Sequence, residues 1–362
     1  MTRTRLLLYV DPAWRRPVRH TALLFPYWGN AYDKTRTPSA HALFNRFQFN
    51  TAEYGVTEHL HEAEMILFPY PYYFRRFAPD VLEECIQRSR ASGTPLLIDG
   101  LGDAQEPVRI PNTCILRYGG YRFLRQANEI IVCPPANDLL ELSGDRQIVL
   151  RQKSDIPSIG FAGWAALSPK QELRAIVKEL PTRMHALFDE RYRACKKGVF
   201  FRKEAIEVLR TSKRVTLHAI VRNSFSAHTN TAEGNQESIQ QEMVDNLLQN
   251  DYGLDVRGDA NASTRLSEIL SLGRIPIIID TERNFPFNDQ LDYSRFSLIV
   301  DFRDLQRLPD IIADFHAALS PEQFEAMQQR ARNAFVQYFR IDALMQHIVR
   351  EIRMRLAKQT AT

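Results

Sequence analysis

The segment at residues 252–279, YGLDVRGDANASTRLSEILSLGRIPIII, constrains the fold of this chain more than any other, because its residue pattern changes twice within one short stretch. Residues 252–256 carry β-forming side chains, and the five residues that follow bring a glycine with residues that favour turns and helix N-caps. A helix is expected to begin near Ala262, because leucine and isoleucine then recur at helical spacing until Gly273. The apolar run at residues 275–279 is typical of a buried parallel strand. The segment therefore predicts a strand, a helix and a second strand.

A strand-helix-strand unit of this kind has a preferred place for a ligand. In parallel sheets, ligands bind outside the carboxyl ends of the strands, where free backbone N–H groups and the helix dipole favour phosphate. Arg257 and Ser263 flank the turn at that position. We therefore expect both to face an anionic group.

Two charged residues on the predicted helix allow two interpretations. Arg265 and Glu268 are three residues apart and share one helix face. In the functional interpretation Arg265 binds phosphate and Glu268 accepts hydrogen bonds from ribose hydroxyls. The alternative is an intrahelical salt bridge worth about 0.2–0.5 kcal/mol. Spacing alone favours the salt bridge.

Several sequence blocks around this segment resemble one known family. They are R-G-D-x-N-x-S-x-R-L-x-E at 257–268, G-R-I-P at 273–276, F-P-F at 285–287 and D-Y-S-R-F at 292–296. In this order they resemble the signature of the exostosin-type glycosyltransferases, glycosyltransferase family 47. Residues 159–163 and 63–69 also resemble strands of that family. The likeness covers most of the chain and is densest at residues 157–340.

The resemblance implies a fold class and an activity. It implies an α/β protein of GT-B type, with two Rossmann-like doubly wound domains facing a cleft. It further implies an inverting glycosyltransferase that moves a sugar from a nucleotide-sugar donor, which we take to be a UDP-sugar, to a hydroxyl of a glycan or glycoconjugate. Surface polysaccharide biosynthesis is one such setting. Because Asp259, Asn261, Arg265 and Glu268 match motif positions, the resemblance assigns them to the donor.

Acceptor chemistry does not follow from the resemblance. The family often has an acidic position with a nearby aromatic residue in its first N-terminal helix, whereas this chain has S-A-H-A-L at 39–43. A catalytically inactive protein of the same fold that binds a nucleotide sugar or a glycan is therefore kept as the alternative function.

The element pattern predicts two domains and a final helix. Strand-like runs at 6–10, 66–69, 96–99 and 130–133 alternate with helical patterns such as 81–90, which indicates a parallel sheet. We place an N-terminal, acceptor-side domain at residues 1–150 and a nucleotide-sugar-binding domain at 151–340, with the linker at 142–157. The second domain is expected to contain helices at 170–180 and 203–209 and strands from 159 and at 215–221.

The last element, at residues 341–358, reads as an amphipathic basic helix. Such a helix can lie on an anionic membrane, which would give peripheral membrane contact. It can equally pack across the seam between the two domains, and we favour that arrangement for residues 341–362.

A polar stretch at residues 222–235 follows a predicted strand and is too long for a plain connection. It is a candidate cleft loop. Arg222, at its start, is a further candidate ligand of a diphosphate, because a guanidinium suits phosphate better than a point charge. A solvated arginine on a surface loop is the alternative.

An inverting transferase needs a base for the acceptor hydroxyl proton. We expect it in the N-terminal domain and consider Asp99 first, because it ends a predicted strand where a doubly wound sheet offers residues to a cleft. Asp11 and His41 follow. The alternatives are a capping or turn carboxylate and a packed histidine.

Missing motifs and the overall charge bear on metals, partners and location. The chain lacks a D-x-D sequence, so metal-independent chemistry is expected, with the nucleotide sugar as substrate and no cofactor. The pair His59 and His61 is expected to be solvated rather than metal-bound. A formal net charge of +4 without a long Lys/Arg block argues against nucleic acid as a partner.

The apolar run at 6–10 is too short for a signal peptide, and the four cysteines show no C-x-x-C spacing. We therefore expect a cytoplasmic protein.

Overall fold

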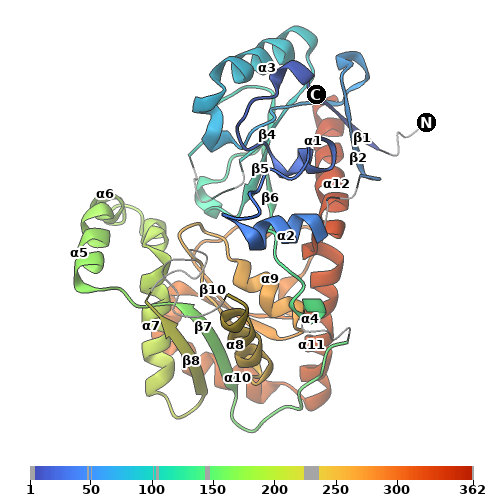
Figure 1. Cartoon of the computed structure of the whole chain (residues 1–362). Coiled ribbons are helices and arrows are strands. Elements are labelled where there is room, and N and C mark those ends of the chain that lie inside the picture. The colour runs from blue at the N-terminus through green and yellow to red at the C-terminus, as the bar shows by residue number, and fades with distance from the viewer. Residues whose placement is uncertain are drawn as a thin grey trace.

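The computed structural model describes residues 5–46, 49, 51–100, 102, 106–142, 147–223 and 236–360. Two parallel β-sheets, each flanked by helices, lie one above the other in Figure 1. The upper sheet has the strand order β2-β1-β3-β4-β5-β6. Its strands are β1 (Leu6–Tyr9), β2 (Tyr54–Thr57), β3 (Met65–Leu67), β4 (Leu96–Asp99), β5 (Thr113–Tyr118) and β6 (Glu129–Val132).

The lower sheet has the strand order β11-β10-β9-β7-β8, again with every pair parallel. Its central strands are nearly continuous runs of buried apolar side chains, as is usual when helices cover both faces. The strands are β7 (Ser158–Trp164), β8 (Thr216–Arg222), β9 (Tyr252–Asp255), β10 (Ile275–Asp280) and β11 (Leu298–Asp301).

Helices connect and cover these strands. The upper sheet carries α1 (Phe25–Trp28), α2 (Pro38–Arg46), α3 (Pro79–Ser92) and α4 (Leu139–Leu142) between or after its strands. The lower sheet carries α5 (Pro169–Lys178), α6 (Leu180–His185), α7 (Gly198–Thr211), α8 (Gln236–Leu248), α9 (Thr264–Ser271), α10 (Leu308–Ala318) and α11 (Pro321–Ala334).

Each sheet reverses its strand order at one point. The first two strands of each sheet lie side by side, and the third strand pairs with the first on its other side: β3 with β1, and β9 with β7. Ligands of doubly wound folds bind at such a switch point, at the carboxyl ends of the strands. The fold therefore offers one position between β1 and β3 and another between β7 and β9.

The chain returns to the upper sheet at its end. After α11, which lies beside the lower sheet in Figure 1, it passes through a π-helical segment (Phe335–Phe339) into α12 (Ile341–Thr360), which lies beside the upper sheet. The apolar face of α12 belongs to the core of the upper sheet, with each of these side chains at most 2% exposed: Ile341, Leu344, Met345, Ile348, Val349 and Ile352. This face is thus not available to a membrane.

The predicted fold class is confirmed, since the chain forms two Rossmann-like α/β units of parallel strands, the arrangement of a GT-B protein. Two strands of the upper sheet were not predicted. β2 is short and contains a glycine, and β5 contains Arg117, whose charge breaks an apolar run. In the sheet, Arg117 pairs with Glu129 of β6 at 2.7 Å, and both are buried. The predicted domain boundaries stay predictions.

Candidate functional site

The switch point of the lower sheet lies at the start of α9. Ser263 is the N-cap of α9, and its hydroxyl accepts a hydrogen bond from the backbone N–H of Arg265. The helix begins two residues later than expected because Ala262 cannot cap an N-terminus. A capped N-terminus beside two parallel strand ends is a suitable place for an anion.

Arg265 and Glu268 form the predicted intrahelical salt bridge, with Nη1 and Oε2 3.0 Å apart. The Arg265 guanidinium also donates from Nη2 to the carbonyl oxygen of Ala162 in β7, at 2.5 Å. These two contacts hold the cation at the carboxyl end of β7. The side chains stay 18% and 23% exposed, so a ligand can reach both. The salt bridge and a role toward a ligand are therefore compatible.

Two further cations lie near Arg265, and neither was predicted from the sequence. Arg202 of α7 donates to the carbonyl oxygens of Trp164 and Val256, which end β7 and extend β9. Burial lowers the pKa of Arg202 to about 10, with a further lowering by the positive charge of Arg265. Lys197, just before α7, lies 5.0 Å from the centre of the Trp164 ring. We call Lys197, Arg202 and Arg265 the cationic cradle.

Arg257 differs from the expectation that it faces an anion. Its side chain is 1% exposed and donates to backbone carbonyl oxygens of Ala194, Lys196, Gly258 and Asp259. Burial lowers the pKa of this guanidinium. Arg257 thus fixes the loop that leads into Lys197 of the cradle, and contact with a phosphate stays a prediction.

The other two motif residues have different surroundings. Asp259 is exposed, and its carboxylate lies 3.7 Å from the ammonium group of Lys197. Asn261 is fully buried and donates to the carbonyl oxygens of Gly120, after β5, and of Thr281, after β10. Asn261 therefore joins the two sheets at their facing edges.

The contact at that junction is close. A Cβ atom on Gly119 would lie 2.1 Å from the carbonyl oxygen of Asn261, and Gly119 has a φ of +61°. Next to it, Arg122 forms ion pairs with Asp280 at 2.8 Å and with Glu282 at 3.2 Å. The loop after β5 and the loops after β9 and β10 are thus held together by both backbone and charge.

The upper sheet brings different chemistry to its carboxyl edge. Asp99 ends β4, is 3% exposed and accepts a hydrogen bond from the hydroxyl of Thr21. Its negative charge contributes, after burial, to raising the pKa of Tyr73 and of Tyr118. The guanidinium of Arg19 donates to the Tyr73 hydroxyl. A carboxylate among tyrosines therefore lies at the edge that also carries Tyr118 and the Gly119 junction.

The two other candidate bases lie elsewhere on this unit. Asp11 caps the short 3-10 turn after β1 and forms an ion pair with Arg88 of α3 at 2.9 Å. His41 lies on α2, which faces the lower unit in Figure 1, and its ring contacts the Asn45 amide. All three candidates thus keep their predicted roles only as predictions, and Asp99 is the one within a buried polar cluster.

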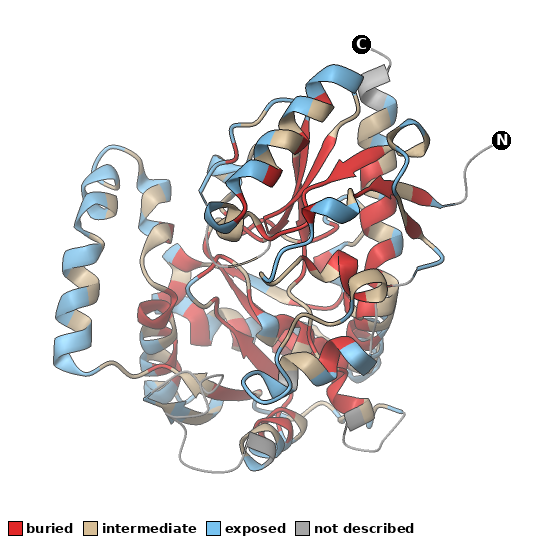
Figure 2. Ribbon diagram, turned by 45° about the horizontal axis from the view of Figure 1, so that its top comes forward, coloured by how far each residue is buried: buried red, intermediate tan, exposed pale blue. Residues whose placement is uncertain are grey.

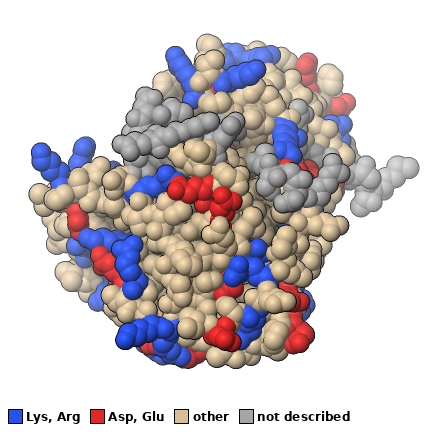
Figure 3. All heavy atoms as spheres, turned by 60° about the horizontal axis from the view of Figure 1, so that its bottom comes forward, with Lys and Arg blue, Asp and Glu red and all other residues tan. Residues whose placement is uncertain are grey.

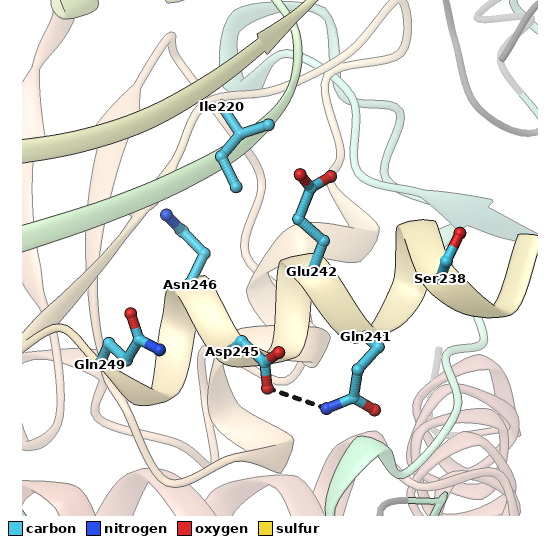
Figure 4. Close-up of a pocket in the computed structure, with 7 residues that line it drawn as sticks. All are labelled: Ile220, Ser238, Gln241, Glu242, Asp245, Asn246 and Gln249. Carbon is cyan, nitrogen blue, oxygen red and sulfur yellow. Dashed lines mark hydrogen bonds between the residues drawn. The ribbon is translucent and has the colours of Figure 1, made fainter. Parts of the chain in front are cut away.

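Arg222 has an acidic partner on a neighbouring helix. Its guanidinium forms an ion pair with Glu242 of α8. Glu242 lines a cavity of about 430 Å³ between β8 and α8, together with the residues drawn in Figure 4: Ile220, Ser238, Gln241, Asp245, Asn246 and Gln249. Its carboxylates would repel a diphosphate. The rest of the candidate cleft loop, residues 224–235, lies outside the described residues.

Metal ligands do not cluster in the described part of the chain, where no three His, Cys, Asp or Glu side chains converge as a possible metal site. His59 and His61 lie near each other, with ring centres 5.8 Å apart, and the His61 ring lies 3.9 Å from the Glu62 carboxylate. The expectation of metal-independent chemistry stays a prediction.

One face of the molecule shows charges of both signs. The face shown in Figure 3 carries separate Lys and Arg groups with acidic side chains between them, and it has no continuous basic surface. Within the described residues, no helix is both long and apolar enough to cross a bilayer.

Comparison with known sequences identifies the family that these residues resemble. Residues 178–315 match the model of the exostosin GT47 domain. The Exostosin-1 homolog of Caenorhabditis elegans is 28% identical over 114 residues, which are 31% of this chain and 29% of that protein. The match thus spans less than a third of the relative. Residues 178–315, which match the family model, include every residue of the cradle and the motif blocks from 257 to 296.

Two solved structures show a weaker likeness that extends over nearly the whole chain. HepE of Anabaena in complex with UDP has a TM-score of 0.39 and 11% identity over 96% of this chain and 100% of that chain. A glycosyltransferase of Rickettsia africae has a TM-score of 0.39 and 9% identity over 99% of each chain. At such TM-scores the likeness does not by itself establish a common fold, which here follows from the strand order.

Proposed function

We propose, on the premise that residues 178–315 are an exostosin GT47 domain, that this chain is an inverting glycosyltransferase. It would move a sugar from a nucleotide sugar, in the first instance a UDP-sugar, to a hydroxyl of a glycan or glycoconjugate. HepE of Anabaena, which was solved with UDP, supports the choice of nucleotide only as a starting point.

The cationic cradle is the observation that carries the proposal. Three cations gather at the carboxyl ends of β7 and β9. The pKa of one of them, Arg202, is lowered by burial and by positively charged neighbours. An anion placed among them would relieve that repulsion. In the proposed complex Arg265 and Arg202 bind the diphosphate, the N-terminus of α9 adds its dipole, and Glu268 accepts hydrogen bonds from the ribose. The same cations would stabilise the departing nucleoside diphosphate.

The base is proposed on the facing sheet. Asp99 lies at the carboxyl end of β4, next to β5, and β5 leads into the Gly119 junction with the donor motif. The Thr21 hydroxyl fixes one carboxylate oxygen of Asp99. In this role Asp99 takes the proton of the acceptor hydroxyl while that oxygen attacks the anomeric carbon from the face opposite the leaving group, which inverts the configuration.

The proposal also covers metal dependence, cofactors and cellular location. The reaction would need no metal ion and no cofactor. A cytoplasmic location is proposed as well, and it is supported by four cysteines that are all free thiols.

Thermal unfolding of the purified chain with a panel of nucleoside diphosphates tests the donor site. At a ligand concentration of about 100 times Kd, stabilisation by about 2.7 kcal/mol is expected from the matching nucleotide. The corresponding nucleotide sugars are then assayed for turnover. Binding without turnover on any glycan acceptor would favour the inactive alternative, and no stabilisation by any nucleotide would refute the donor site.

A further inference from the structure

The α5–α6 hairpin extends away from both sheets and buries none of its residues. In Figure 1 it projects to one side of the lower unit, and in Figure 2 it shows exposed and intermediate colours but no buried ones. Neither α5 nor α6 contains a buried residue. Every other helix of eight or more residues contains buried side chains, so among the described helices of that length α5 alone buries none.

The hairpin is nevertheless strongly apolar on its outer surface. Phe188 is 91% exposed and Leu187 is 79% exposed. Four further large apolar side chains of the hairpin are more than half exposed: Leu173, Val177, Leu180 and Met184. Large exposed apolar side chains that gather on one element, rather than lying scattered singly, mark a site of interaction. The six residues are called the apolar patch.

The sequence encodes these helices despite the missing partner. Ser168 and Gln171 form a complete capping box, and Pro169 occupies the first turn of α5. Helices of 10 and 6 residues are nevertheless marginal in water when they bury no face. A surface that covers the apolar patch would supply the missing burial.

The charged residues of α5 indicate what kind of surface would cover the apolar patch. Lys170, Arg174 and Lys178 follow one another at four-residue spacing, so they form one row along α5. This row borders the apolar stripe that contains Leu173 and Val177. Among the described residues, these three cations form no ion pair. By contrast, the acidic residues on the other flank of α5 are engaged, Glu172 with Lys203 and Glu179 with Arg183.

The hairpin and the residues that follow it carry an excess of positive charge. Residues 169–197 contain eight Lys or Arg against four Asp or Glu, which gives a net +4 and equals the formal net charge of all 362 residues. Apolar side chains beside a row of cations are the pattern of a helix that lies in the interface of an anionic membrane. A protein partner or a second copy of this chain would not require that row.

We propose that the α5–α6 hairpin docks this protein on a lipid surface with anionic headgroups, with the apolar patch inserted and the row of Lys170, Arg174 and Lys178 against the headgroups. The base of the hairpin rests on the junction, because Tyr192 packs on Phe123 with ring centres 5.0 Å apart. Docking would therefore bring the junction between the sheets to the lipid surface. This inference does not depend on the proposed glycosyl transfer.

Vesicle sedimentation of the full chain tests the proposal. Binding is expected to vesicles of phosphatidylcholine with phosphatidylglycerol and to be much weaker with phosphatidylcholine alone. The variant Leu187→Ser/Phe188→Ser should lower the partition coefficient at least tenfold. The variant Lys170→Gln/Arg174→Gln/Lys178→Gln should lower it roughly a hundredfold on anionic vesicles. The glutamine variant leaves every apolar contact of the hairpin in place, so it keeps the test valid if the serine variant unfolds the hairpin.

Matched controls use exposed residues outside the hairpin. Val149→Ser/Ile156→Ser removes two exposed apolar side chains, and Arg210→Gln/Lys213→Gln/Arg330→Gln removes three exposed cations. Both should bind vesicles as the unchanged chain does. Equal loss in controls and hairpin variants, or no vesicle binding at all, would overturn the proposal. So would self-association without lipid that Leu187→Ser/Phe188→Ser abolishes, because a second copy would then cover the patch.

Discussion

The two sheets share the order of their first five strands, to which the upper sheet adds β6, but they present different side chains at their carboxyl edges. The lower sheet ends in the cationic cradle and the capped N-terminus of α9. The upper sheet ends in a buried carboxylate, Asp99, among tyrosines. Equal topology therefore sets where ligands bind, whereas the residues at the strand ends set which chemistry each edge can perform.

In the proposed reaction, the two edges have separate tasks. Cations suit the diphosphate of a donor, and a carboxylate suits a proton from an acceptor hydroxyl. The junction at Gly119, Gly120 and Asn261 holds the two edges together. Changes at the upper edge should thus affect turnover, changes at the lower edge should affect nucleotide affinity, and changes at the junction should affect stability.

The largest effect is expected at the upper edge. Asp99→Asn removes the proposed base and keeps the size of the side chain, so kcat should fall about 10³-fold. Nucleotide affinity should stay within about twofold, since Asp99 does not belong to the cradle. The measurement is initial-rate kinetics together with calorimetric titration of the nucleoside diphosphate.

Asp11→Asn and His41→Gln are the matched controls for that experiment. Each changes another candidate base of the same unit, and neither should lower kcat as far as Asp99→Asn does. A greater loss for Asp11→Asn or His41→Gln would transfer the role of base to that residue.

The junction should show the next largest effect. Gly119→Ala places a methyl group against the Asn261 carbonyl oxygen at a positive φ, so unfolding free energy should fall by about 3 kcal/mol. Gly93→Ala is the control, because Gly93 has a φ of +75° with no atom within 4 Å of the added Cβ. It should cost about 1 kcal/mol. Denaturant unfolding measures both, and equal losses would mean that the close approach to Asn261 contributes nothing.

A smaller effect is expected on the lower edge. Glu268→Ala should weaken nucleoside diphosphate binding about tenfold, which is about 1.4 kcal/mol, with unchanged thermal stability. Glu207→Ala, which removes an exposed glutamate of α7, should leave the affinity unchanged. If Glu268→Ala binds like Glu207→Ala, Glu268 serves only the salt bridge to Arg265.

The sequence predicted the lower unit better than the upper one. Residues 252–279 form the expected strand, helix and strand because caps, periodicity and the apolar run all agree locally. β5 was missed because Arg117 finds its partner Glu129 only in the assembled sheet. Arg202 and Lys197 were missed for the same reason, since α7 meets the donor motif only through the tertiary fold.

Two amphipathic basic helices show the same limit. The patterns of α12 and α5 both allow a membrane or a protein partner, and local sequence does not decide between them. In the structure α12 buries its apolar face in the upper core, whereas α5 leaves Leu173 and Val177 exposed. What distinguishes the two helices is their position in the folded chain: α12 packs against a core, and α5 does not.

Calorimetric titration of the chain and of Arg265→Ala with the best-stabilising nucleoside diphosphate tests the central claim most directly. Arg265 is the cradle residue that joins α9 to the carboxyl end of β7. Its loss should weaken binding roughly thirtyfold, as expected for a hydrogen bond between charged groups. Arg210→Ala, at an exposed position of α7, should bind as the unchanged chain does. Equal affinity of Arg265→Ala and the unchanged chain would contradict a donor site at the switch point of the lower sheet.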